Sequence, residues 1–249
     1  MPLPPAFEAR LVSARRLTPS VRELAFERAD SQPMVFEPGQ WVNAYLPLPG
    51  EPESPEGPLK RSYSIASAPE GSSRFEIAVT RVQSGRGSAW LHEVEAGAAL
   101  RFVGPQGFFT RGASSEAPSL MIATGTGVTP IRSMLRAALA AGSRAPMWIV
   151  LGVRHEEDIL YRDELEAMAR DHANVRFEPT LSQPPGTWSG RRGYVQAHVS
   201  ELWSELSRGG TVAPHAYVCG LERMVGSVRQ MLRVDLGLPR QQVHAERYD

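Results

Sequence analysis

Two residue types that often build chemical sites are nearly missing from this sequence. Cys219 is the only cysteine, so the chain can form no internal disulfide and no zinc or iron–sulfur site held by cysteine ligands. Lys60 is the only lysine, which excludes a Walker-type phosphate loop because that loop needs a lysine after its glycines. The six histidines include no pair at metal-ligand spacing on a predicted helix, and we therefore expect no metal site.

The sequence also lacks an excess of charge and any long apolar run. Its 27 basic and 27 acidic residues give a formal net charge of zero, so nothing indicates nucleic acid or a membrane surface as a partner. No apolar run approaches the length of a membrane span, and residues 1–10 lack the basic start and apolar stretch of a signal peptide. We expect a soluble cytoplasmic protein.

The first part of the chain has the pattern of a β domain. Short runs of alternating apolar and polar residues are separated by turn residues, which predicts a small antiparallel barrel of six strands. One helix is expected from Ser88, and residues 48–58, rich in proline, glycine and glutamate, are expected to form an exposed loop. The predicted strands lie within residues 7–18, 21–28, 39–48, 61–67, 74–82 and 99–105.

From about Leu120 the pattern changes to buried strands alternating with amphipathic helices, which predicts a doubly wound α/β domain with a five-stranded parallel sheet. Residues 111–119 are expected to form the linker, so we predict two domains, 1–112 and 113–249. The predicted strands are 119–125, 147–153, 175–182, 215–220 and 243–249, and the predicted helices are 130–142, 157–171, 195–206 and 223–237.

Two glycine-containing turns are candidate phosphate sites. In "ATGTGVTP" (123–130), Gly125 and Gly127 follow the first buried strand and precede a helix whose free N–H groups could hold a phosphate, although an ordinary strand-to-helix turn has the same pattern. In "QSGRGSAWLHEV" (83–94), Gly85 and Gly87 expose the backbone and Ser88 is expected to cap a short helix. Taken in isolation, this second segment is better explained as a capped surface helix.

The segment "KRSYSIASAP" (60–69) carries Arg61 and Tyr63 two residues apart, hence on one face of a predicted strand. An arginine beside a helix N-terminus makes a good pyrophosphate site. Alone, the segment could equally be an amphipathic edge strand.

Several motifs together resemble the ferredoxin–NADP reductase superfamily. "RSYS" (61–64) matches its R-x-Y-S flavin motif, and "GTGVTP" (125–130) is similar to its G-x-G-x-x-P nucleotide motif. The family's other landmarks follow in the same order along nearly the whole chain. They are "PGQWV" (38–42), "GRGS" (85–88), "GPQGFF" (104–109) and "YVCG" (217–220).

The resemblance implies FAD as a cofactor. Arg61 would bind flavin phosphate, Tyr63 would lie against the isoalloxazine ring, and Ser64 would be a catalytic residue that hydrogen-bonds near flavin N5. The remaining implied flavin contacts are Ser62, main-chain groups of Val79 and Arg81, and the amides of Gly87 and Ser88 at the pyrophosphate.

The resemblance also implies a nicotinamide site. Cys219, Glu246 and Tyr248 would be its catalytic residues, although Glu246 could be a solvated strand-end carboxylate and Cys219 an ordinary small buried residue. Tyr248, which would also cover the flavin, is followed by Asp249, whereas the plant-type members end on the aromatic residue. The implied coenzyme turn consists of Gly125, Thr126, Gly127, Thr129 and Pro130.

The implied activity is hydride transfer from NADPH to flavin N5, followed by single-electron transfer to a carrier. Because this chain cannot ligate a cluster through cysteines, the carrier should be separate, a ferredoxin or a flavodoxin. The alternatives are an NAD(P)H-dependent free-flavin reductase, an oxygenase reductase component that serves an oxygenase partner, or a non-catalytic flavin-holding module that senses redox state.

The basic residues after the second and third predicted parallel strands favour NADPH over NADH. Arg154 takes the place where an NAD-selective fold normally has an acidic residue, and Ser182, Arg191 and Arg192 follow the next strand. Arginine grips a phosphate well, which suggests that this group contacts the 2′-phosphate. Chance placement of arginine in an arginine-rich chain is the alternative.

Overall fold

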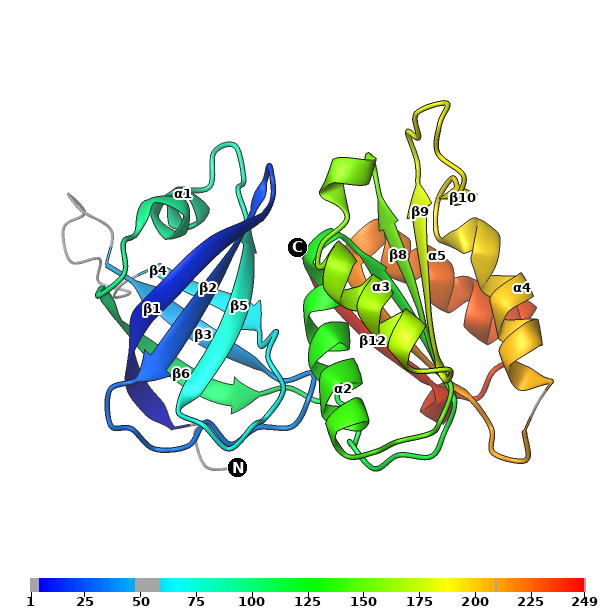
Figure 1. Cartoon of the computed structure of the whole chain (residues 1–249), viewed down its shortest axis with the longest axis horizontal. Helices are drawn as coiled ribbons and strands as arrows, with labels where there is room; N and C mark the ends of the chain where they lie inside the picture. Colours follow the sequence, from blue (N-terminus) through cyan, green and yellow to red (C-terminus); the bar gives the residue numbers. More distant parts are fainter. Residues whose placement is uncertain (1–4, 48–58, 209, 249) are drawn as a thin grey trace.

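The computed structural model describes residues 5–47, 59–208 and 210–248 and contains two β-sheets that lie side by side, each with its own helices (Figure 1). The predicted loop at 48–58 lies outside the described residues. No helix in the described part of the chain is long and apolar enough to cross a membrane. The same residues contain no group of three or more potential metal ligands.

The N-terminal sheet is the predicted six-stranded antiparallel barrel. Its strand order is β4-β3-β6-β1-β2-β5, and a bridge between Ile65 and Ile77 joins the two outer strands and closes the barrel. Alternate residues point inward, and four packed phenylalanines, Phe7, Phe26, Phe75 and Phe102, lie in its core. The strands are β1 (Ala6–Thr18), β2 (Val21–Arg28), β3 (Trp41–Leu46), β4 (Leu59–Ser64), β5 (Arg74–Thr80) and β6 (Ala99–Gln106).

The C-terminal sheet is parallel, with the strand order β10-β9-β8-β7-β11-β12. All five predicted strands are present, and the sheet has a sixth, β10 (Arg191–Arg192), which pairs with the end of β9. Two residues are too few to show an alternating pattern, so this strand could not be predicted from the sequence. The longer strands are β7 (Ser119–Thr124), β8 (Met147–Val153), β9 (Val175–Leu181), β11 (His215–Leu221) and β12 (Val243–Tyr248).

Helices cover both faces of the parallel sheet, as the doubly wound prediction requires (Figure 1). Two of them, α2 (Val128–Ala140) and α3 (Arg162–Asp171), pack on the face nearer the barrel, and α4 (Gln196–Ser207) and α5 (Glu222–Gln230) pack on the other face. The helix predicted from Glu157 begins only at Arg162, because Tyr161 has a left-handed backbone with φ 55°. The short helical turns are η1 (Gly125–Gly127), η2 (Glu156–Asp158), η3 (Met231–Asp235) and η4 (Arg240–Gln242).

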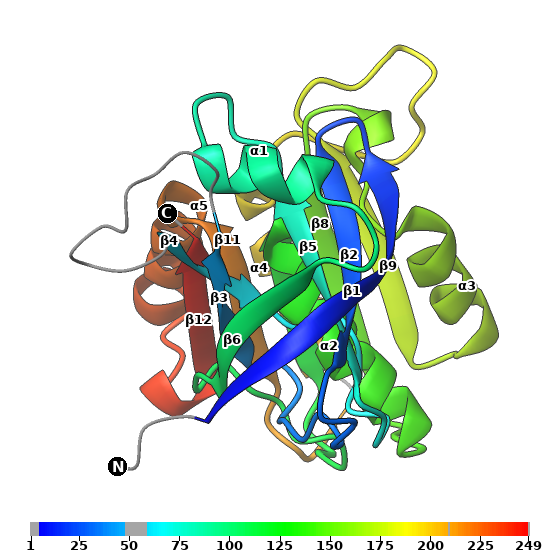
Figure 2. The ribbon, with the colours of Figure 1, turned by 90° about the vertical axis from the view of Figure 1, so that its left-hand side faces the viewer.

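The predicted linker, residues 111–119, is folded around a buried arginine. Arg111 is 1% exposed and donates to the hydroxyl of Ser119 and to the carbonyl oxygens of Gly112 and Ser115. The barrel lies in front of the parallel sheet when the molecule is seen along its long axis (Figure 2). The end of β4 meets the carboxyl end of β12 at the junction, where Ser64 contacts Glu246 and Tyr248.

Candidate active site

Three predicted catalytic residues form a hydrogen-bonded chain at the junction of the two domains. Ser64, the last residue of β4, donates to a carboxylate oxygen of Glu246 at 3.1 Å. The hydroxyl of Tyr248 donates to the Ser64 oxygen at 2.6 Å. Glu246 and Tyr248 are two apart on β12 and therefore point to the same side of that strand. The fold thus joins residues that lie more than 180 positions apart in the sequence.

The environment of Glu246 changes its acidity. Burial raises the pKa of Glu246 to about 7, against a smaller opposite effect from the Ser64 hydroxyl. A carboxyl group with a pKa near 7 exchanges a proton under neutral conditions, which is the property required of a general acid or base. The alternative of a fully solvated strand-end carboxylate does not fit this partly buried group.

This pKa leads to a prediction about stability. The carboxyl of Glu246 has its ordinary pKa of 4.5 when the chain is unfolded and about 7 when it is folded, so the folded state holds the proton more tightly. The stabilisation present below pH 4.5 is lost as the pH rises through 7. We expect the melting temperature of the wild type to fall relative to that of Glu246→Gln between pH 5 and pH 8. A difference between the two melting temperatures that stays constant over this pH range would contradict the raised pKa of Glu246.

Cys219 lies beside this group but has no exposed surface. It is paired with Glu246 across β11 and β12. Burial raises the pKa of its thiol well above the usual value, and Glu246 adds to the effect. The side chain is therefore a neutral thiol and lacks the thiolate character of a nucleophile. The partly buried ring of Tyr248 packs against the same core and interacts with the Cys219 thiol.

The predicted pyrophosphate site is built by α1 (Arg86–Glu93) and β4. A Cβ atom added to Gly87 would lie 3.6 Å from Cγ of Arg61, so the fold brings these two predicted residues together. The first bond of the helix runs from the Ala89 N–H to the Gly85 carbonyl, which leaves the N–H groups of Gly87 and Ser88 without an acceptor inside the helix. Free amides beside an arginine are a suitable donor set for a pyrophosphate.

The prediction that Ser88 caps this helix is wrong. The N-cap position is occupied by Gly85, and the Ser88 hydroxyl instead accepts from the Val82 N–H at 3.0 Å and donates to the Gly85 carbonyl at 2.9 Å. Ser88 thus shapes the turn before the helix. The glycines identify the turn in the sequence, but they do not predict which groups the Ser88 hydroxyl bonds.

The other predicted flavin residues lie on β4, near the end of β5 and just after it. Tyr63 packs against the barrel core, and burial raises the pKa of its phenol to about 12, so the ring is neutral. Ser62 is exposed and donates to Asn43 at 2.8 Å. Arg81 is exposed and donates to the Val82 carbonyl.

Val79 has a partner that the sequence did not suggest. It is buried at the end of β5, and its carbonyl oxygen lies 2.8 Å from Nε2 of His92. Burial lowers the pKa of His92, which favours the neutral ring as the hydrogen-bond donor. This contact ties the last turn of α1 to β5. A single histidine in a helical segment does not predict this contact with a strand.

The two glycines of the coenzyme turn differ in how much room they have for a side chain. Gly125 has φ +52° and open space beyond its Cα, whereas a Cβ added to Gly127 would lie 2.2 Å from the carbonyl oxygen of Cys219. The turn thus sits directly on β11. Thr129 and Pro130 are buried in the first turn of α2, and Thr129 donates to the Thr126 carbonyl. The Thr126 hydroxyl meets that of Thr80 at 3.4 Å and so touches the barrel.

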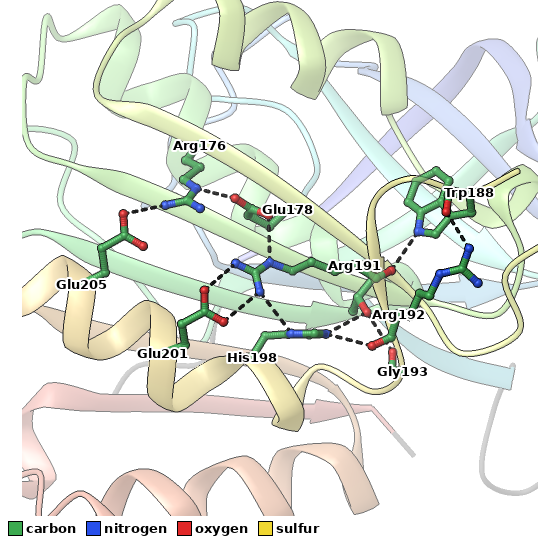
Figure 3. A network of polar contacts seen from close by, with 10 residues as sticks. Arg176, Glu178, Trp188, Arg191, Arg192, Gly193, His198, Glu201 and Glu205 are labelled. Carbon is green, nitrogen blue, oxygen red and sulfur yellow. Dashed lines mark hydrogen bonds and ion pairs between the residues drawn. The ribbon is translucent and has the colours of Figure 1, made fainter.

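The arginines predicted to contact the 2′-phosphate are not equivalent, and Figure 3 shows two of them, Arg191 and Arg192. Arg191 is held by Glu178 at 2.8 Å and by both carboxylate oxygens of Glu201, and it also contacts His198. The guanidinium of Arg191 is thus committed to partners of its own domain.

The neighbouring residues have other surroundings. Arg192 donates to main-chain carbonyls of the preceding loop, including that of Trp188 at 2.6 Å. Ser182 is partly buried and bonds weakly to the Val153 carbonyl. In the described part of the chain, the exposed guanidinium of Arg154 makes no hydrogen bond or ion pair. Arg154 is therefore available to an incoming anion, whereas Arg191 is already paired with carboxylates.

Comparisons with known proteins agree with this architecture. A family model described as "Oxidoreductase FAD-binding domain" matches residues 8–110, and one described as "Oxidoreductase NAD-binding domain" matches residues 121–230. The fold and these matches define a two-domain oxidoreductase with one domain for FAD and one for a nicotinamide dinucleotide.

A close relative narrows the assignment. The chain is 62% identical over 98% of its length to "Ferredoxin--NADP reductase B" of Sorangium cellulosum (strain So ce56), of which it covers 98%. The chain belongs to the ferredoxin–NADP reductase superfamily. It is also 26% identical over 97% of its length to the phenol hydroxylase P5 protein of Acinetobacter pittii (strain PHEA-2), but it spans only 65% of that protein.

A solved structure has the same fold over its whole length. The ferredoxin NADP+ reductase from Neisseria gonorrhoeae, determined with bound FAD and NADP, superposes with a TM-score of 0.79 at 21% identity and covers 97% of this chain and 98% of that one. The predicted family and fold are thus confirmed. The domain boundary at 112 and the roles of the individual residues remain our predictions.

Proposed function

We propose that this chain is a ferredoxin–NADP reductase, which transfers a hydride from NADPH to bound FAD and passes electrons singly to a separate carrier. The observation that carries the proposal is the meeting of Ser64 with Glu246 and Tyr248 where the two domains face each other. Full-length similarity to a ferredoxin–NADP reductase supports it. The carrier we propose is a ferredoxin or a flavodoxin, since this chain has a single cysteine and so cannot ligate a cluster through cysteines.

The described residues fit the cofactor. Arg61 and the free amides of Gly87 and Ser88 would hold the pyrophosphate of FAD, and the neutral ring of Tyr63 would lie along the flavin. Ser62 on β4, Val79 near the end of β5 and Arg81 just after it would supply the remaining flavin contacts. The turn from Gly125 to Gly127, with Thr126, Thr129 and Pro130, would hold the phosphates of the coenzyme.

The protein's own contribution is to position groups and to hold a proton. When bound, FAD supplies the ability to accept two electrons from a nicotinamide and release them one at a time. The Ser64 hydroxyl has a fixed orientation because it donates to Glu246 and accepts from Tyr248. Glu246, with its pKa of about 7, can store or release a proton beside that hydroxyl.

Coenzyme choice provides a further prediction. The exposed guanidinium of Arg154 would bind the 2′-phosphate of NADPH, whereas Arg191 is held by two carboxylates. We expect Arg154→Ala to narrow the preference for NADPH over NADH in kcat/KM by about 1–3 kcal/mol, and to leave NADH turnover almost unchanged.

Arg191→Ala is the matched comparison, because it removes a neighbouring arginine whose charge is already paired. This variant should change kcat/KM for NADPH and for NADH by the same factor. Steady-state kinetics with each coenzyme would measure both variants. Equal kcat/KM values of the wild type for NADPH and NADH, or an Arg154→Ala variant with unchanged selectivity, would show that Arg154 does not contact the phosphate.

The proposed activity can be tested with the visible spectrum. The purified protein should be yellow and should bleach rapidly when NADPH is added without oxygen, and it should then reduce added ferredoxin or flavodoxin. Protein that stays yellow would indicate a non-catalytic flavin module. Colourless protein that reduces free flavin would indicate a free-flavin reductase. Both of these results would contradict the proposal.

A further inference from the structure

A second polar cluster, away from the proposed hydride site, joins the two domains. Its centre is Arg132 in α2, whose side chain is 3% exposed. The guanidinium donates to the Ala66 carbonyl at 2.9 Å and to Glu76 at 2.7 Å, both in the barrel domain. It also donates to Glu164 of α3 at 2.9 Å and lies 4.4 Å above the centre of the Tyr161 ring.

Two neighbours on α2 make parallel contacts to the same barrel segment. Ser133 donates to the Ser67 carbonyl at 2.7 Å, and Arg136 pairs with Glu70 at 2.6 Å. The Ser67 hydroxyl in turn accepts from the N–H of Glu76, which links this segment to β5. We call this set the domain clasp, which consists of Arg132, Ser133 and Arg136 of α2 with Ala66, Ser67, Glu70 and Glu76 of the barrel.

The clasp lies close to both halves of the proposed reaction centre. Ala66 follows Ser64 by two residues, about 7 Å of extended chain, with no loop between them. Arg132 follows Gly127 by five residues of helix, a rise of about 7.5 Å. The helix that begins at the coenzyme turn is thus bonded to the segment that directly follows Ser64, and α2 lies beside the barrel (Figure 1).

The chemistry of the clasp favours a fixed geometry. A guanidinium is a planar fork that satisfies several acceptors at once, and it stays charged even when buried. A buried charge that loses one partner is strongly destabilised, and separation of the two domains at this point would remove both Glu76 and the Ala66 carbonyl from the buried guanidinium of Arg132. An adjustable contact between domains would be expected to use exposed pairs instead.

We infer that Arg132 is a positioning residue for hydride transfer, because its clasp sets the position of the coenzyme turn relative to Ser64. The inference rests on the proposed function, since it assumes that a hydride crosses between the two domains. A misplacement of about 1 Å can cost about 100-fold in rate without changing what is bound. The expected signature is therefore a slower transfer step with unchanged binding.

Arg132→Lys is the central test. A lysine keeps the positive charge, but its single ammonium group cannot bond all the acceptors that the guanidinium of Arg132 bonds. Anaerobic stopped-flow reduction by NADPH should give a limiting rate at least 10-fold below that of the wild type. The FAD content and the NADPH dissociation constant from the same traces should change less than twofold. Hydrogen–deuterium exchange, which does not depend on activity, should be faster in residues 65–70 and 129–136.

Arg162→Lys is the matched control. Arg162 also pairs with two glutamates, Glu156 and Glu166, but all three residues lie in one domain and are partly exposed. This variant should retain the wild-type rate and exchange pattern. If Arg132→Lys does not accumulate as folded protein, Ser133→Ala removes one clasp bond and should show the same pattern with a smaller rate loss.

The inference would be overturned by a limiting rate within twofold of wild type in folded Arg132→Lys, or in Ser133→Ala where that variant replaces it. It would also be overturned if the lower rate were fully explained by a lower FAD content of the variant. A wild-type protein that NADPH does not reduce would instead refute the proposed function. The exchange experiment would then still show whether the clasp holds the domains together.

Discussion

Replacing Ser64 by alanine should lower the limiting rate of FAD reduction by NADPH about 100-fold, the usual size of a lost proton-handling or positioning group. The substitution removes the hydroxyl that donates to Glu246 and accepts from Tyr248. Because Arg61 and the free amides of α1 are untouched, FAD should remain bound. Anaerobic stopped-flow measurement at saturating NADPH gives the rate, and the visible spectrum gives the FAD content.

Ser73→Ala is a close control for this variant. The Ser73 hydroxyl also donates to a glutamate, Glu27, at 3.2 Å, but this pair lies within the barrel domain and away from the proposed site. Its removal should leave the reduction rate unchanged. A Ser64→Ala protein whose rate is within twofold of the wild type would remove Ser64 from the proposed active site.

Gly127→Ala should be the most damaging of the small substitutions. The new methyl group would lie 2.2 Å from the Cys219 carbonyl oxygen and 2.8 Å from the Cα atom of Gly220, both on β11. That strand is held between β7 and β12 and cannot retreat. Either the coenzyme turn moves outward with α2 or the core is strained, and overpacking of this kind costs about 1–3 kcal/mol of the free energy of unfolding. We expect the affinity for NADP+ to fall sharply as well.

Gly125→Ala provides the comparison two residues away. There a methyl group meets open space, and the cost is limited to the left-handed backbone, about 1 kcal/mol. Urea unfolding and NADP+ titration of both variants would separate the two effects. Equal losses in both measurements would mean that contact with β11 is not what requires glycine at 127.

Much of the architecture was already determined by local sequence. Alternating runs predicted the barrel strands, and buried runs between amphipathic helices predicted the parallel sheet, because periodicity records which side of an element faces a core. The glycine turn before α2 and the R-x-Y-S motif at 61–64 were also visible, since each requires particular residues at adjacent positions. The two-residue strand β10 and the start of α3 after the left-handed Tyr161 were missed, because neither leaves a periodic signal.

Tertiary structure decided which of these residues act together. Only the packing of the domains brings Ser64 to Glu246, raises the pKa of that carboxyl to about 7, and places Arg132 between Ala66 and Glu76. Only side-chain geometry shows that Arg191 is already paired while Arg154 is not. Sequence patterns report on neighbours within a strand or a helix, whereas burial, charge pairing and hydrogen bonds between distant segments depend on how those elements pack.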